Sequence, residues 1–88
     1  SVFKLIEDAE VMEIGVEEDS SIVNKQIAKI KFPKDAIIGA ILRKGEMLLP
    51  NDEVILEAGD SVIVVVLPGT IEKIEKLFGR KRSFLPFR

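Results

Sequence analysis

The sequence predicts a small α+β domain, a two-layer fold of the β-α-β-β-β-α type in which two helices pack on a small sheet. Three observations support this class. The chain has 88 residues, which is room for one core. Short runs of β-branched and other apolar residues alternate with turns rich in Gly and Pro, which is typical of strands. Two further stretches space their apolar residues by three and four positions, which is typical of amphipathic helices.

The first third of the chain is predicted to hold strands followed by a helix. Val11 to Val16 is a short β-type run, and Val2 to Ile6 before it is a weaker strand candidate. The side-chain oxygens of residues 19 to 21 (Asp-Ser-Ser) are suited to accept the free N–H groups at a helix start. The predicted helix ends at Pro33, and its buried stripe comprises Val23, Ile27 and Ile30.

The remainder is predicted to hold three or four strands and a closing helix. Ala36 to Leu42 and Val62 to Leu67 are apolar throughout, and the second is the strongest strand candidate in the chain. Two shorter runs lie between them, bounded by turns: Met47 to Leu49 after Gly45, and Val54 to Leu56 before Ala58-Gly59-Asp60. The closing helix opens at Pro68-Gly69-Thr70, stops at Gly79 and buries Ile71, Ile74 and Leu77 or Phe78.

The two longest strands are apolar on both faces, whereas two short helices can cover only one face of a sheet. The other face needs a cover. A second copy of the chain is the favoured cover, so we expect a homodimer. The alternative is that loops and the N-terminal strand close over this face.

The composition excludes most enzyme chemistry. There is no Cys and no His, which removes thiol nucleophiles, thiolate metal sites and the commonest general base. The net charge of −2 argues against nucleic acid as a partner. The acidic groups at 17–19 and 52–60 do not match the spacing of a calcium loop, so no metal site is expected. The longest strictly apolar stretch, Val62 to Leu67, is far too short to cross a bilayer.

An ordered set of short motifs resembles the C-terminal domain of the RCK/TrkA regulators of potassium transport (RCK_C or TrkA-C). The set runs from Ser20 to Val66 and comprises Ser20, Lys25, Phe32-Pro33, the apolar run Ala36 to Arg43, Gly45-Glu46, Pro50, Leu56 and Gly59-Asp60 before Val62 to Val66. The chain departs from the pattern at Asn24, where the family usually has Gly.

The resemblance implies a regulatory, ligand-sensing and dimerising domain at residues 1–79, followed by a basic tail at 80–88. Its expected place is the cytoplasm, at the cytoplasmic face of the cell membrane, beneath a potassium transporter or channel subunit. The chain contains no Gly-x-Gly-x-x-Gly motif, so the nucleotide-binding Rossmann domain of the family is absent from it. NAD or ATP would belong to that domain. The expected mechanism is that a ligand changes the geometry of the dimer, and the runner-up is a purely structural dimerisation domain.

The resemblance also implies a groove between two copies that can hold cyclic di-AMP, around residues 32 to 43. The ligand-binding residues expected there are Phe32, Pro33, Lys34, Ile37, Ile38 and Arg43. Lys34 and Arg43 are the nearby cations able to meet phosphates. The dimer interface is expected at Ile37, Ile38, Ala40 and Ile41. The same apolar side chains would equally suit a dry dimer core without any ligand.

Overall fold

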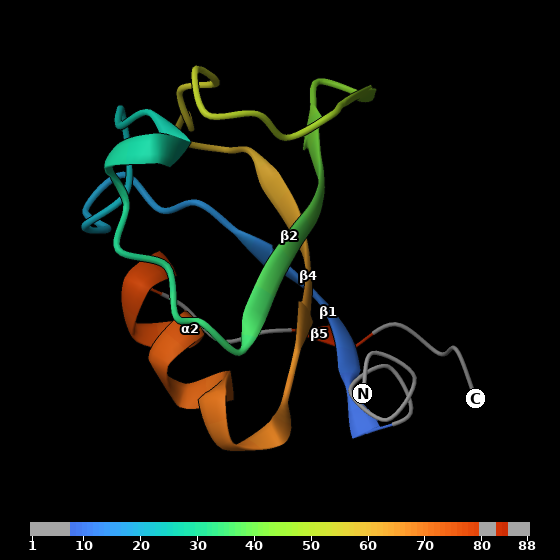
Figure 1. Cartoon of the computed structure of the whole chain (residues 1–88). Coiled ribbons are helices and arrows are strands. Elements are labelled where there is room, and N and C mark those ends of the chain that lie inside the picture. The colour runs from blue at the N-terminus through green and yellow to red at the C-terminus, as the bar shows by residue number, and fades with distance from the viewer. Residues whose placement is uncertain (1–7, 80–82, 85–88) are drawn as a thin grey trace.

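A five-stranded antiparallel sheet forms the centre of the molecule, in the order β3-β2-β4-β1-β5 (Figure 1). The computed structural model describes residues 8–79 and 83–84. The strands are β1 (Glu10–Gly15), β2 (Ala36–Arg43), β3 (Glu46–Leu48), β4 (Ser61–Val66) and the two-residue β5 (Ser83–Phe84). The helix α2 (Ile71–Phe78) and the segment between β1 and β2 lie on one side of the sheet (Figure 1). The α+β class is therefore confirmed.

The alternation of side chains along β1 and β4 decides which face of the sheet is buried. Val62, Val64 and Val66 are buried, whereas the residues between them are half-buried. β1 follows the same period of two and buries Met12 and Ile14 opposite β4. This is the pattern of strands with one face in a core and the other turned outward.

The closing helix covers the buried face, as the sequence predicts. Ile74 and Phe78 are fully buried, and Ile71 and Leu77 pack at the edge of the same core. Gly79 ends the helix in the left-handed conformation (φ 76°), with its N–H donating to the carbonyl of Glu75 at 2.9 Å. A glycine in this position avoids the penalty of a side chain at positive φ.

The predicted helix between residues 20 and 32 is wrong. The structure has turns there, and the one short helical element is the 3₁₀ turn η1 (Ile27–Lys29). The backbone instead bonds to a segment far along the chain. Asn24 N–H donates to the carbonyl of Leu56, and Ile27 N–H donates to that of Val54. These two bonds tie residues 24–27 to residues 54–56, so the stripe of spaced apolar residues packs on the core from a loop.

Asn24 explains why this segment does not continue as a helix. Its φ is 63°, in the left-handed region that Gly and Asn tolerate best. The same conformation accounts for the Gly that the resemblance leads one to expect at this place.

The run from Val54 to Leu56 does not form a strand of the sheet, because its pairing is a single bridge between Ile55 and Gln26. The predicted turns are confirmed at Gly45 and Gly59, which have φ values of 80° and 90°. The weaker strand candidate at Val2 to Ile6 lies outside the described residues. Within the described part of the chain, no helix is long and apolar enough to span a bilayer.

Candidate functional site

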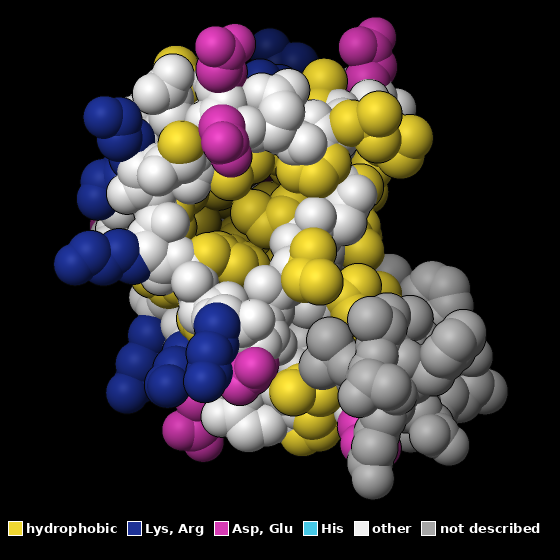
Figure 2. All heavy atoms as spheres, viewed as in Figure 1, with side chains coloured by type: hydrophobic (Ala, Val, Ile, Leu, Met, Phe, Trp, Pro, Cys, Tyr) yellow, Lys and Arg dark blue, Asp and Glu magenta, His cyan; other side chains and the backbone are white. Residues whose placement is uncertain are grey.

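The outer face of the sheet is apolar and has no layer of described secondary structure over it. The term outer face is used below for the side chains that point away from α2 on β2, β3 and β4 and in the residue after β3. They are Ile37, Ala40, Leu42, Met47, Leu49, Ile63 and Val65. In Figure 2, hydrophobic side chains run along the right margin, on the side of the sheet opposite α2.

Three side chains on the outer face are highly exposed for apolar groups. Ile37 is 58% exposed, Met47 is 64% exposed and Leu49 is 70% exposed. Soluble monomers rarely leave a contiguous apolar surface of this kind uncovered, and such surfaces mark interaction sites. At one border of the face the Ser61 hydroxyl donates a hydrogen bond to the Glu13 carboxylate, which supplies a polar rim. The outer face is therefore the candidate functional surface.

A β-bulge sorts the four predicted interface residues into two groups. The register of β2 against β4 shifts between Ile38 and Ala40, so the alternation of faces changes phase at Gly39. Ile37 and Ala40 point to the outer face. Ile38 points to the core, and Ile41 is 0% exposed within one copy. The expectation that Ile41 contacts a second copy is therefore wrong, because its buried side chain exposes no surface to a partner.

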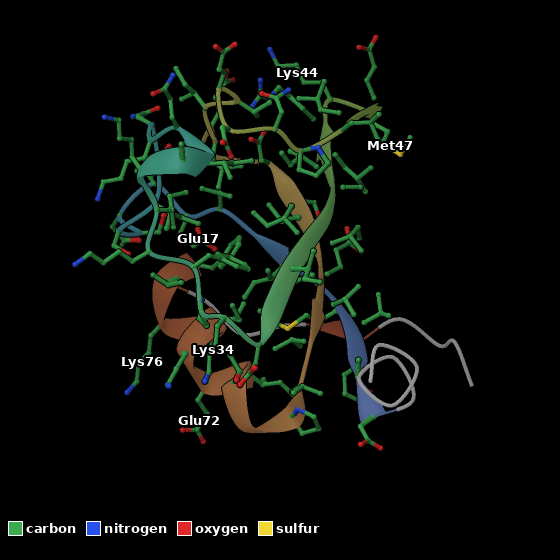
Figure 3. The ribbon with its side chains drawn as sticks, viewed as in Figure 1. Glu17, Lys34, Lys44, Met47, Glu72 and Lys76 are labelled. Atoms are coloured by element: carbon green, nitrogen blue, oxygen red, sulfur yellow. The ribbon has the colours of Figure 1, made fainter. Side chains whose placement is uncertain are left out.

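The predicted ligand residues do not come together in one place. Phe32 and Ile38 pack at the edge of the core. Figure 2 shows a hollow with hydrophobic side chains at its bottom, between residues 27–34 and β2. Ile37 belongs to the outer face, whereas Lys34 is exposed and lies on the side of the molecule that carries Lys76 (Figure 3).

Arg43 is held by a network that leaves it little freedom to meet a ligand. Its guanidinium pairs with both carboxylate oxygens of Asp60, with Nε to Oδ1 and Nη2 to Oδ2 at 2.8 Å each. Nη2 also donates to the carbonyl of Ile55 at 2.8 Å, and Nη1 lies 3.1 Å from the Glu57 carboxylate. Two parallel hydrogen bonds to one carboxylate are among the stronger polar contacts in proteins. Arg43 therefore fastens the loop at 55–60 to the end of β2.

Asp60 holds Arg43 in place from a buried position. The residue is 2% exposed and also accepts the Glu57 N–H at 2.8 Å. Burial by itself raises the pKa of the Asp60 carboxyl, but the hydrogen bonds from Arg43 and Glu57 and the charge of Arg43 outweigh burial and lower that pKa. Hydrogen bonding to Asp60 raises the pKa of the Arg43 guanidinium, so both groups stay charged. The sequence places Asp60 in a turn and in an acidic group but does not predict its pairing with Arg43.

Acidic side chains gather where β1 ends and β4 begins. A pocket of about 920 Å³ is lined by Glu13, Glu17, Glu18 and Asp19 together with residues 58–61. Among the described residues, no group of His, Cys, Asp and Glu is arranged to hold a metal ion.

The described residues thus form a small α+β sheet with an apolar outer face. The chain belongs to the TrkA-C domain family, whose model matches residues 11–79.

Several similar curated proteins are named as Trk system potassium uptake proteins. TrkA homolog 2 of Methanosarcina mazei is 39% identical over 72 residues, which is 82% of this chain and 16% of that protein. The TrkA homolog of Archaeoglobus fulgidus is 40% identical over 73 residues, again covering 16% of the relative. The chain therefore spans about one sixth of the length of these relatives.

Solved structures share the fold. The RCK_C domain dimer of S. agalactiae BusR in complex with c-di-AMP is 26% identical, with a TM-score of 0.70, and covers 80% of this chain and 96% of that one. An RCK domain solved with a ligand named cda has a TM-score of 0.69 at 23% identity, which shows the fold alone. BusR has also been solved with its busAB-promotor DNA, and there the match covers 36% of the BusR chain.

Proposed function

We propose that this chain is a regulatory dimerisation domain of a potassium-transport protein, and that the outer face is the contact between two copies. The observation that carries the proposal is the exposed apolar surface formed by Ile37, Met47 and Leu49. Membership of the TrkA-C family supports the connection with potassium transport. The dimeric state of the similar BusR domain supports the assembly.

The proposed ligand is a cyclic dinucleotide, taken up where two copies meet. The support is the BusR domain dimer, which is similar in fold and was solved with c-di-AMP. Ile37, predicted for both the ligand site and the interface, and Ala40, predicted for the interface, lie on the outer face, which is the face proposed to meet a second copy. A ligand in this position can shift the dimer only by the difference between its affinities for two dimer geometries. In a longer protein on the cytoplasmic side of a membrane, that shift would be passed to the transporter.

The decisive variant is Ile37→Asp, because it places a charge on the outer face at a side chain that is 58% exposed. Ala28→Asp is the matched control, since Ala28 is an exposed apolar residue in η1, away from the sheet. We expect sedimentation to show a dimer for the parent chain and for Ala28→Asp at micromolar concentration. Ile37→Asp should be a monomer with an unchanged circular dichroism spectrum. A parent chain that sediments as a monomer refutes the proposed interface.

Titration calorimetry with c-di-AMP tests the ligand. We expect saturable binding at one nucleotide per two chains, lost in Ile37→Asp, and much weaker binding of AMP. If the parent chain is a dimer that takes up no c-di-AMP, the domain is the structural dimerisation module that forms the second candidate. The separation of Phe32, Ile37 and Arg43 in the structure favours that second candidate.

A further inference from the structure

A second surface feature lies on the α2 side, away from the outer face. It is a pocket of about 350 Å³ formed where three segments meet: the turn at Ser21, the loop at Lys31 and Pro33, and α2 from Lys73 to Leu77. Its lining residues are Ser21, Lys31, Pro33, Lys73, Lys76 and Leu77. This set is called the lysine pocket below. Its volume lies at the lower end of the range for small-molecule sites.

The charge of the lysine pocket is uniformly positive. Three of its six lining residues are lysines and none is acidic. No ion pair between described residues involves Lys31, Lys73 or Lys76. Figure 2 shows basic side chains following one another down the left side of the molecule, and Figure 3 places Lys34 on the same side as Lys76. Because the whole chain has a net charge of −2, this concentration of cations is local.

The base of the pocket is apolar and held in place. Pro33 and Leu77 are half-buried, and the Ser21 hydroxyl donates to the Leu77 carbonyl at 3.3 Å. This bond and the Gly79 N–H donated to Glu75 satisfy two of the last carbonyls of α2. The C-terminal end of α2 remains negative, so the attraction for an anion comes from the lysines.

We propose that the lysine pocket binds an organic molecule carrying two or more directly linked phosphate groups, as in a nucleoside diphosphate or triphosphate. Ammonium groups are compact charges with three donors each, and three of them around a rim suit a ligand whose negative charge is spread over several phosphates. The apolar base of Pro33 and Leu77 suits the carbon part of such a ligand. The site lies within one copy of the chain, so the proposal does not depend on the dimer or on c-di-AMP.

The test is titration calorimetry with ATP, without divalent cations, at 0.15 M salt. We expect saturable binding at one ATP per chain. The triple variant Lys31→Gln/Lys73→Gln/Lys76→Gln should lower the affinity at least tenfold. The matched triple variant Lys25→Gln/Lys29→Gln/Lys44→Gln removes the same charge from exposed positions outside the pocket. It should change the affinity less than threefold.

Two further measurements distinguish ATP binding in the lysine pocket from ATP binding elsewhere on the protein. Inorganic pyrophosphate should bind at least tenfold more weakly than ATP, and equal affinities would overturn the role of the apolar base. The monomeric variant Ile37→Asp should bind ATP as the parent chain does. Loss of ATP binding in that variant would move the ligand to a contact between copies and overturn the lysine pocket. Equal effects of the two triple variants, or no saturable binding of ATP, would also overturn it.

Discussion

Replacing Arg43 by Met tests whether the network around Asp60 holds the fold together. The substitution keeps most of the length of the side chain and removes its charge and its donors. Asp60 would lose both hydrogen bonds from the guanidinium and keep only the N–H of Glu57, while remaining 2% exposed. The loop at 55–60 would also lose the bond from Arg43 to the Ile55 carbonyl.

The expected loss is about 3 to 5 kcal/mol in the free energy of unfolding, because an uncompensated carboxylate stays buried. The total available to a chain of this size is roughly 4 to 13 kcal/mol. The loss is therefore a large fraction of the total stability, and all of it at the lower end of that range. Adding Asp60→Asn in the same chain removes the buried charge, so the double variant should regain at least about 1 kcal/mol.

Urea unfolding followed by far-ultraviolet circular dichroism is the suitable assay, since the chain contains no Trp or Tyr for fluorescence. Lys44→Met is the control, because Lys44 is the exposed next residue and has no ion pair with another described residue. It should change the unfolding free energy by less than about 0.5 kcal/mol. If Arg43→Met loses less than about 1 kcal/mol, the network does not hold the loop and the reasoning fails.

The dependence of stability on pH gives an independent check. The folded protein has a lower pKa at Asp60 than the value of about 3.9 expected in the unfolded chain. The contribution of Asp60 to stability is therefore present above about pH 4 and lost as the pH falls through the folded pKa. In Arg43→Met, burial without the cation raises the pKa of Asp60. In this variant Asp60 therefore destabilises the folded protein increasingly as the pH rises and the carboxyl ionises.

Two further substitutions test the loop and the core. Asn24→Val should cost about 1 to 2 kcal/mol in thermal unfolding, because a β-branched residue is strained at φ 63°, whereas Asn24→Gly should stay within about 0.5 kcal/mol. Equal effects of the two would show that the left-handed conformation is not required. Ile41→Ala should cost about 2 to 5 kcal/mol in urea unfolding and leave the dimer intact in sedimentation at the same concentration. Dissociation without loss of stability would return Ile41 to the interface.

The sequence predicts β1 to β4 and the closing helix because their signals are local, whereas β5 lies in the stretch expected to be a basic tail. β-branched runs, positive-φ glycines and the spacing of Ile74 and Phe78 each act within a few residues. The predicted helix at 20–32 fails for the opposite reason. Its apolar spacing is compatible with a helix, but its backbone bonds go to residues 52–56, nearly thirty positions away. The same hydrogen bonds occupy backbone groups of residues 54–56, which therefore do not pair as a strand of the sheet. The wrong helix prediction and the wrong strand prediction thus have the same cause.

The interface prediction fails in part through a single irregularity. In an undistorted strand, Ile37 and Ile41 would share a face, because side chains alternate with a period of two. The bulge at Gly39 moves Ile41 to the core and brings Ala40 beside Ile63 of β4 on the outer face. The pairing of Arg43 with Asp60 was equally hidden, since it joins residues seventeen positions apart.

The outer face and the lysine pocket lie on opposite sides of the sheet, and this separation limits how the two could influence each other. A ligand between two copies is coupled to assembly directly, because it contacts both. A ligand in the lysine pocket contacts one copy, so it can affect the dimer only if the sheet and α2 have two arrangements with different affinities. Such coupling is reciprocal: the factor by which dimer formation changes the affinity for ATP equals the factor by which ATP changes the dimer affinity.

Because the structure shows a single, fully buried core between the two surfaces, including Val64, Ile74 and Phe78, we expect that factor to be close to one. Regulation through dimer geometry would then rest on the ligand between copies alone.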